Sequence, residues 1–279
     1  MMLRLTPLAT AFLAGSLLVS PFVSAFEINA GNTTASIYGF AKLDVIQDLD
    51  ADLGSAVNPG AIRADGQPGP DGHSTLHTYQ SRFGIATSTP TTRGDLKTRI
   101  EGDFFGSDGG EFRLRHAYGE WNGLLAGQTK TNFGSDRFIG FTPTVDFNGQ
   151  VGQAQLGRLA QLRYSLGGFA IALEDPSGFI GATTLPVDEQ NTSKSRLPHL
   201  TMRYHGTTGG LQYAASALLR EVEYHRGIND SNDRTLGWGL ALEASIPLTE
   251  SIKMQGAVTH GDGIGNYLYG NPALASGVG

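Results

Sequence analysis

Residues 96–104 read Leu-Lys-Thr-Arg-Ile-Glu-Gly-Asp-Phe, and charged residues occupy every second position of this stretch. One set of alternate positions holds Leu96, Thr98, Ile100, Gly102 and Phe104, and the other holds Lys97, Arg99, Glu101 and Asp103. A period of two residues predicts a β-strand. Because one face is fully charged and the other is mostly apolar, the strand is typical of a wall that separates water from lipid.

The same alternation recurs along the rest of the chain. It is found at 37–45, 80–88, 112–121, 124–130, 159–165, 169–175, 199–205, 211–220, 236–246 and 252–260. Together with the opening stretch this makes about eleven strands, and no long amphipathic helix is predicted. Tight links such as Asn122-Gly123 alternate with long segments such as 131–158, as short periplasmic turns and long outer loops do in outer-membrane barrels.

The N-terminus has the features of an export signal. Residues 1–25 contain Arg4, an apolar run from Leu8 to Val19 and the small-residue ending Val23-Ser24-Ala25, which predicts a signal peptide cleaved after Ala25. No later run reaches the roughly 18 apolar residues that a spanning helix needs. We therefore expect a signal peptide over 1–25 and an all-β, transmembrane antiparallel barrel in the outer membrane over 26–279.

Composition supports a barrel and limits the partners. The 39 glycines and the 16% of charged residues suit strands that are polar on one face and apolar on the other. The net charge of −6 argues against a nucleic-acid partner. A secreted β-sandwich is the alternative, but it needs neither the long and short connections nor so many glycines.

Strand parity assigns the charged residues to an inner face, because an Arg or Lys at the lipid midplane costs about 2–4 kcal/mol. The basic residues of this face are Lys42, Arg82, Lys97, Arg99, Arg113, Arg115, Arg163, Arg203, Arg220 and Lys253, and the acidic ones are Asp44, Glu101, Asp103, Glu174 and Glu243. One interpretation is a basic pore wall that concentrates anions. The other is that the charges pair across the wall to stay solvated and to stiffen the barrel.

The segment 131–158 is the candidate for a loop that folds into the pore. Its aromatic and charged residues include Phe133, Asp136, Arg137 and Asp146, and a connection of this length is uncommon unless it has a function. The alternative is an ordinary outer loop packed against the rim or a neighbouring subunit.

No catalytic or metal-binding pattern emerges, so neither a metal nor a cofactor is predicted. The seven histidines include no His-Glu-x-x-His sequence, and the residues after Asp48 lack the glycine and glutamate of a calcium loop. His116 and His199 are assigned to the outward parity, where they would suit a subunit interface or an aromatic girdle.

Several segments resemble the DcaP-like family of Gram-negative porins. They are Ile37–Asp44, Ser81–Gly84, Ile100–Phe105, Leu114–Tyr118 and Leu125–Thr129, and the similarity extends from about residue 35 to 165. The resemblance implies a trimeric barrel of about sixteen strands, a constriction loop at 131–158 and a preference for small anions such as dicarboxylates.

The chain departs from this family at its C-terminal end. It ends in Ser276-Gly277-Val278-Gly279, without a terminal aromatic residue and after an odd number of predicted strands. We therefore expect a barrel that is incomplete at the C-terminus and needs about five more strands to close.

The sequence thus predicts a non-enzymatic porin for passive diffusion, with outer-membrane lipid, small anionic solutes and two further copies of the chain as partners. The rival functions are an outer-membrane enzyme, for which no catalytic constellation is found, and a structural or adhesive barrel with a plugged lumen.

Overall fold

The computed structural model describes residues 26–49, 72–107, 109–134, 157–176, 197–224 and 233–268, together with Ala154 and short pieces between 52 and 69. Fourteen strands and one 3-10 turn are described within these ranges. None of the described residues forms a helix long and apolar enough to cross a membrane. The predicted signal peptide, 1–25, lies outside the described residues.

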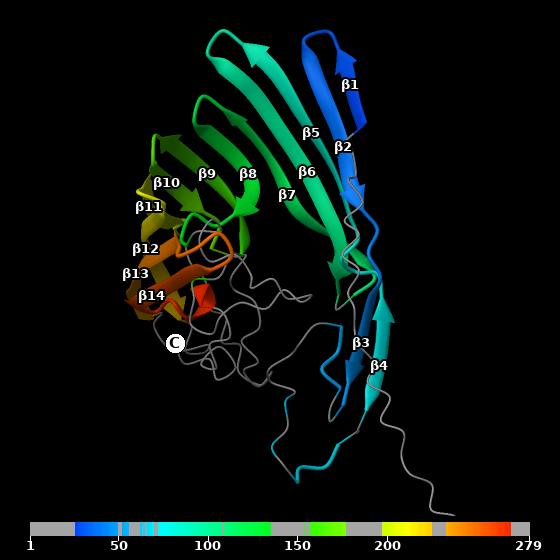
Figure 1. Cartoon of the computed structure of the whole chain (residues 1–279). Helices are drawn as coiled ribbons and strands as arrows, with labels where there is room; N and C mark the ends of the chain where they lie inside the picture. Colours follow the sequence, from blue (N-terminus) through cyan, green and yellow to red (C-terminus); the bar gives the residue numbers. More distant parts are fainter. Residues whose placement is uncertain are drawn as a thin grey trace, which may run out of the picture.

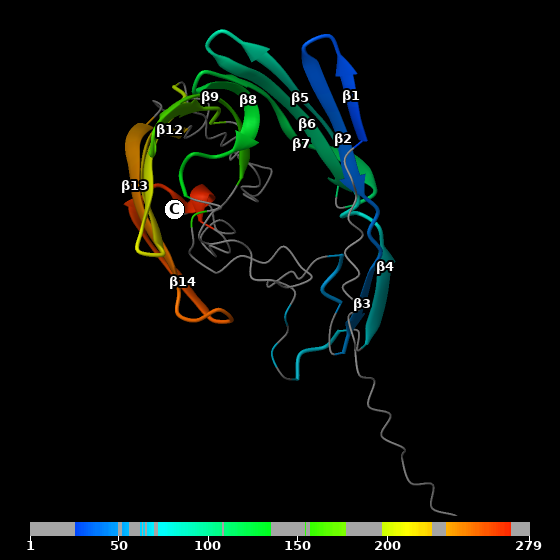
Figure 2. The same cartoon turned by 45° about the horizontal axis from the view of Figure 1, so that its top comes forward.

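Twelve strands form one antiparallel sheet and pair in chain order, with two intervening strands left out of the sheet. They are β1 (Phe26–Ala30), β2 (Thr33–Phe40), β5 (Arg82–Thr91), β6 (Gly94–Gly106), β7 (Glu111–Trp121), β8 (Leu124–Lys130), β9 (Arg158–Leu166), β10 (Phe169–Glu174), β11 (His199–Thr208), β12 (Leu211–Tyr224), β13 (Asp233–Pro247) and β14 (Lys253–Asp262). The sheet curls into a trough with β1 and β14 at its edges, and the 3-10 turn η3 (Gly265–Tyr267) lies inside it (Figure 1 and Figure 2). The all-β prediction is confirmed.

This sheet exposes apolar side chains on its outer face and buries polar ones on its inner face, the reverse of the arrangement in a soluble protein. Along β13 the apolar Leu240 and Leu242 are exposed on the convex outer face, whereas Ala241, Glu243 and Ser245 are buried on the concave inner face. Along β10 the exposed and buried residues alternate in the same way. An outward apolar surface is expected where the surroundings are lipid, so the β-sandwich alternative does not apply.

Aromatic side chains mark one border of this outer face. Trp121, Tyr164, Phe169 and Tyr204 are all exposed, and they lie near the tight turns that join β7 to β8 and β9 to β10. Rings at this level match the aromatic girdle that barrels place at the membrane interface.

The tight turns have the backbone that two-residue hairpins require. Asn122 and Gly123 join β7 to β8 with φ angles of 49° and 82°. Two consecutive positive φ angles match the twist of the flanking strands, and Asn-Gly adopts them at low cost. The sequence therefore predicted this hairpin correctly.

One predicted strand is divided in two. The alternation at 37–45 predicts a single strand, but β2 ends at Phe40, and β3 (Asp44–Asp48) pairs with β4 (His73–His77) in a separate two-stranded sheet. The ladder breaks because residues 78–81 form a turn on the partner strand, and the Lys42 amide donates to the Ser81 hydroxyl at 3.0 Å instead. The hairpin therefore leaves the sheet at this point (Figure 1).

The outward position of Leu240 yields a test of the lipid-facing surface. Leu240 lies near the middle of β13 and is half exposed. Leu240→Arg should lower the free energy of unfolding in lipid vesicles by about 2–4 kcal/mol, because a charge would then face the bilayer midplane. Urea titration followed by tryptophan fluorescence measures this change. Leu240→Met is the control, and an equal stability of the two variants would contradict the assignment.

Candidate functional site: the basic inner wall

The inner face of β6 carries two buried carboxylates. Glu101 is 1% exposed and accepts hydrogen bonds from Arg115 Nε at 3.0 Å, from Tyr38 Oη at 3.0 Å and from Arg99 Nη2. Arg82 Nε lies 3.4 Å from the same carboxylate. Glu101 is therefore shared by three arginines from β5, β6 and β7. A single carboxylate balances only one of these charges.

Asp103 extends this network by one step along β6. Arg113 holds it with two parallel hydrogen bonds of 2.9 and 2.8 Å, and Arg115 Nη1 donates to the same side chain at 2.6 Å. Arg115 thus bridges Glu101 and Asp103. Such paired, charge-assisted hydrogen bonds fix the guanidinium planes as well as attract them.

A β-bulge places Arg115 in this bridging position. In the pairing of β6 with β7, Glu101 lies opposite His116 while Gly102 lies opposite Leu114, so Arg115 is the extra residue. Consequently both Arg115 and His116 are buried on the inner face. The bulge shifts the parity of the rest of β7, which brings Tyr118 to the inner face as well.

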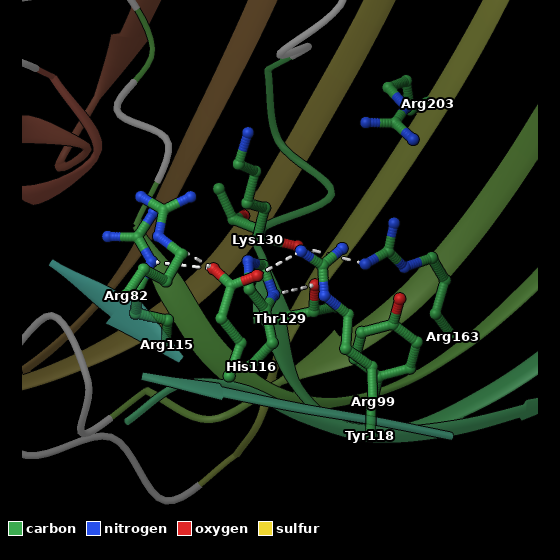
Figure 3. A pocket seen from close by; sticks show the side chains of 11 residues that line it. Arg82, Arg99, Arg115, His116, Tyr118, Thr129, Lys130, Arg163 and Arg203 are labelled. Carbon is green, nitrogen blue, oxygen red and sulfur yellow. Dashed lines mark hydrogen bonds and ion pairs between the residues drawn. The ribbon is translucent and has the colours of Figure 1, made fainter. Parts of the chain in front are cut away.

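Beside the network lies a cavity of about 320 Å³. The residues that line it are Arg82, Arg99, Glu101, Arg115, His116, Tyr118, Thr129, Lys130, Thr131, Arg163 and Arg203. Six of these are arginine or lysine and one is acidic. Figure 3 shows the basic side chains arranged around the cavity from several strands. The wall is therefore strongly basic although the whole chain carries −6.

The basic residues on the far side of the cavity donate to neutral groups. Arg163 donates to Gln161 Oε1 at 2.9 Å and to the Lys130 carbonyl at 3.0 Å. Arg203 donates to the Gly134 carbonyl at 3.1 Å. Hydrogen bonds of this kind orient the planar guanidinium group.

The remaining predicted basic positions lie away from the cavity. Lys42 is in the link between β2 and β3, where its Nζ contacts Asp44 at 2.6 Å and Gln80 at 2.5 Å. Lys97 is on the inner face of β6 nearer the tight turns, opposite Glu120 of β7. The structure thus brings together Arg82, Arg99, Glu101, Asp103, Arg113, Arg115, Arg163 and Arg203, but not Lys42 and Lys97. Their role as pore-lining residues stays a prediction.

The candidate constriction loop is described only at its two ends. Asp136, Arg137 and Asp146 lie outside the described residues. Phe133 is described, and its side chain is fully buried against Tyr267 at a ring separation of 5.6 Å. This ring therefore anchors the start of the segment and does not line an open passage.

Two histidine assignments were wrong. His116 faces inward because of the bulge, and its Nδ1 lies 3.0 Å from the Thr129 hydroxyl. His199 pairs with Glu174 across β10 and β11 and is fully buried on the inner face, at the same parity as Arg203. Strict alternation also misses Tyr118 and Lys130. No three His, Asp or Glu residues of the described ranges are grouped as a metal site.

Comparison with known proteins identifies similar sequences and folds. The family model of the DcaP outer membrane protein matches residues 23–271. The chain is similar to the crystal structure of the outer membrane channel DcaP of Acinetobacter baumannii, with 25% identity and a TM-score of 0.70 over 89% of this chain and 69% of that chain. No curated protein sequence matches.

Two further solved structures are more distant. One is an anion-selective porin from Comamonas acidovorans, at 15% identity and a TM-score of 0.37 over 83% of this chain and 80% of that chain. The other is OmpT of Vibrio cholerae, at 12% identity and a TM-score of 0.31 over 85% of this chain and 89% of that chain.

Replacing Glu101 tests how much the shared carboxylate contributes to stability. Glu101→Gln should lower the free energy of unfolding by about 1–3 kcal/mol, because three arginines lose a common anion that water in the cavity replaces only in part. Chemical unfolding of the refolded protein measures the change. Glu120→Gln removes the same charge from an exposed position of the inner face and is the control. A loss as large in Glu120→Gln would show that the shared carboxylate has no special role.

Proposed function

Because the chain belongs to the DcaP outer membrane protein family, we propose that its basic cavity is part of a pore through which small hydrophilic anions diffuse. The protein is a porin of the outer membrane, a channel rather than an enzyme. The charges of the inner wall support the proposed preference for anions.

The excess of positive charge around the cavity carries this proposal. Six basic side chains face one acidic side chain there, and including the neighbouring Asp103–Arg113 pair leaves that excess unchanged. A charged wall of low dielectric focuses its field into a narrow aqueous space and raises the local concentration of counter-ions. The net charge of the whole chain contributes little at this range, because exposed charges beyond about 10 Å are screened by salt.

Mutual pairing alone accounts for only part of the wall. Glu101 and Asp103 together neutralise two of the four arginines that surround them. Arg163 and Arg203 extend the basic lining of the cavity to β9 and β11. If the charges served only to stiffen the barrel, equal numbers of acidic and basic residues would have a lower electrostatic free energy, because excess like charges repel each other.

The arrangement of the cations favours solutes with two carboxylates. Guanidinium groups reach the cavity from β5, β6, β9 and β11, at Arg82, Arg99, Arg163 and Arg203. Each guanidinium can hold a carboxylate through two parallel hydrogen bonds. Cations on separate strands can therefore engage both ends of a small molecule, and we propose dicarboxylates as the preferred class.

The assembly that we propose is a homotrimer. Its support is the family resemblance together with the apolar outer face, which can contact neighbouring copies as readily as lipid. Native mass spectrometry in detergent distinguishes a trimer from a single barrel.

Charge reversal at Arg163 tests the anion preference. Arg163→Glu should reduce the anion-to-cation permeability ratio by about twofold or more, because it removes one positive charge from the cavity and adds a negative one. The measurement is the reversal potential of single channels in a potassium chloride gradient. Arg163 suits this test better than Arg115, whose replacement by Glu would place a third carboxylate beside Glu101 and Asp103.

Lys253→Glu provides the matched control. It makes the same change in charge at the start of β14, close to a tight turn and away from the cavity. An unchanged reversal potential in Arg163→Glu, or an equal shift in both variants, would contradict the proposal. Silence from a folded wild-type protein would favour the barrel with a plugged lumen.

A blocking experiment tests the solute class. Succinate should inhibit the chloride current at about tenfold lower concentration than propionate, because one additional charge-assisted contact contributes roughly 1.5 kcal/mol. Current recordings at increasing solute concentration give the half-blocking values. Equal values for the two acids would exclude a site that engages both carboxylates.

A further inference from the structure

The two halves of the inner wall are built differently. On the β5–β8 side the inner face borders the basic cavity. On the β9–β14 side Arg163 and Arg203 reach the same cavity, and beside them an apolar cluster that contains Leu159, Leu218 and Ala241 of the wall covers the inner face. The covering residues, Phe133 and Tyr267, come from the connections that follow β8 and β14. They are completely buried.

A buried carboxylate fastens the first of these connections to the wall. Glu174, at the end of β10, is fully buried and accepts hydrogen bonds from the Thr131 hydroxyl at 2.7 Å and from the Asn132 backbone amide at 2.5 Å. It also accepts one from the hydroxyl of Thr201 on β11 at 3.1 Å. Two of the three donors therefore belong to the connection, and the third belongs to the wall.

Further hydrogen bonds extend the attachment along residues 131–134. The Asn132 side-chain amide donates to the carbonyls of Ala170 and Thr201, at 3.3 and 3.4 Å. The Gly134 amide donates to the Ser216 hydroxyl of β12 at 3.3 Å. The segment thus lies across three consecutive strands, β10, β11 and β12, and is held by each of them.

The connection that follows β14 packs against the one that follows β8. Tyr267 of η3 packs edge-on against Phe133, and its hydroxyl lies 2.6 Å from His199 Nδ1. Burial raises the pKa of the Tyr267 phenol above its ordinary value, so the hydroxyl stays protonated and shares a hydrogen bond with His199. The ring is therefore fixed at both ends.

Two glycines provide the space for this packing. A Cβ atom at Gly261 would lie 2.7 Å from Ile264 Cδ1, and one at Gly239 would lie 3.0 Å from the same atom and 3.2 Å from Phe133 Cζ. Ile264 and Phe133 therefore fit against bare backbone on β13 and β14. This close approach indicates a specific docking surface on the inner wall.

We propose that residues 131–134 and 264–268 form one fixed internal partition and that Glu174 is the positioning residue that holds it. The partition excludes solute from the inner face around Leu159, Leu218 and Ala241 and confines the aqueous path to the side of the basic cavity. The inference rests on the chain being a channel but is independent of its preference for anions.

The energetics of Glu174 favour this role. A buried carboxylate is costly unless hydrogen bonds or a cation compensate for lost solvation. Among the described residues no arginine or lysine lies within salt-bridge distance of Glu174, and its compensation comes from the three donors together with the more distant charge of Arg163. Undocking the connection would remove two of these donors. The buried carboxylate is therefore best stabilised while the connection is docked, and this favours the docked position.

Single-channel recording of Glu174→Ala in planar bilayers tests the proposal. Loss of the acceptor should release residues 131–134 and raise the mean conductance by roughly half, with greater open-channel noise, because a wider path conducts more. Glu174→Gln keeps one acceptor oxygen, so its mean conductance should lie between those of the wild type and Glu174→Ala. Glu120→Ala removes a carboxylate from the inner face without touching the partition and should leave the noise unchanged.

A double-mutant cycle separates positioning from general destabilisation. Thr131→Val removes one donor from the other side of the same contact. If the two groups act together, Glu174→Ala combined with Thr131→Val should have no greater effect on conductance than Glu174→Ala alone. Heat-modifiable migration on gels and far-ultraviolet circular dichroism confirm that each variant is folded.

The opposite results are equally clear. Wild-type conductance and noise in folded Glu174→Ala, or additive effects in the cycle, would overturn the proposal. Should Glu174→Ala fail to fold, Tyr267→Phe and Thr131→Val supply milder changes on the two sides of the partition. A silent wild type would refute the channel itself, whereas an active wild type with unaltered variants would refute only the partition.

Discussion

The high cost of placing charge in lipid governs this structure. Along β6 and β10 it places apolar side chains on the outer face and the charges on the inner face. Once the arginines share one face, repulsion between them must be relieved, and Glu101 and Asp103 provide that relief. The carboxylates thus allow a dense group of cations to exist, while their small number leaves the wall basic.

Alternation in the sequence was sufficient for much of this arrangement. The stretch 96–104 places Arg99, Glu101 and Asp103 on one face, and the structure joins all three in the same network. The Asn122-Gly123 hairpin is also correctly located, because its backbone angles suit few other residues. Such features depend on neighbours in the chain, so a single sequence reveals them.

Features that depend on pairing between strands could not be predicted in this way. The bulge at Arg115 changes the register by one residue. The sequence on either side of Arg115 is still compatible with an unbroken strand, so it does not indicate the shift. The break after Phe40 likewise depends on a turn at 78–81, some forty residues away. The cluster around Phe133 and Tyr267 joins segments separated by more than a hundred residues, and no local pattern indicates it.

The division of the inner wall has a consequence for how such a protein can diversify. Four of the arginines stand on β5, β6 and β7, whereas the docked segments rest on β9 to β14, which carry Arg163 and Arg203 as well. Substitutions on one group of strands alter the electrostatic character of the passage, and substitutions on the other alter its width. A lineage can therefore change which solutes it admits by charge without changing the size it admits, and the two properties can be selected separately within one sheet.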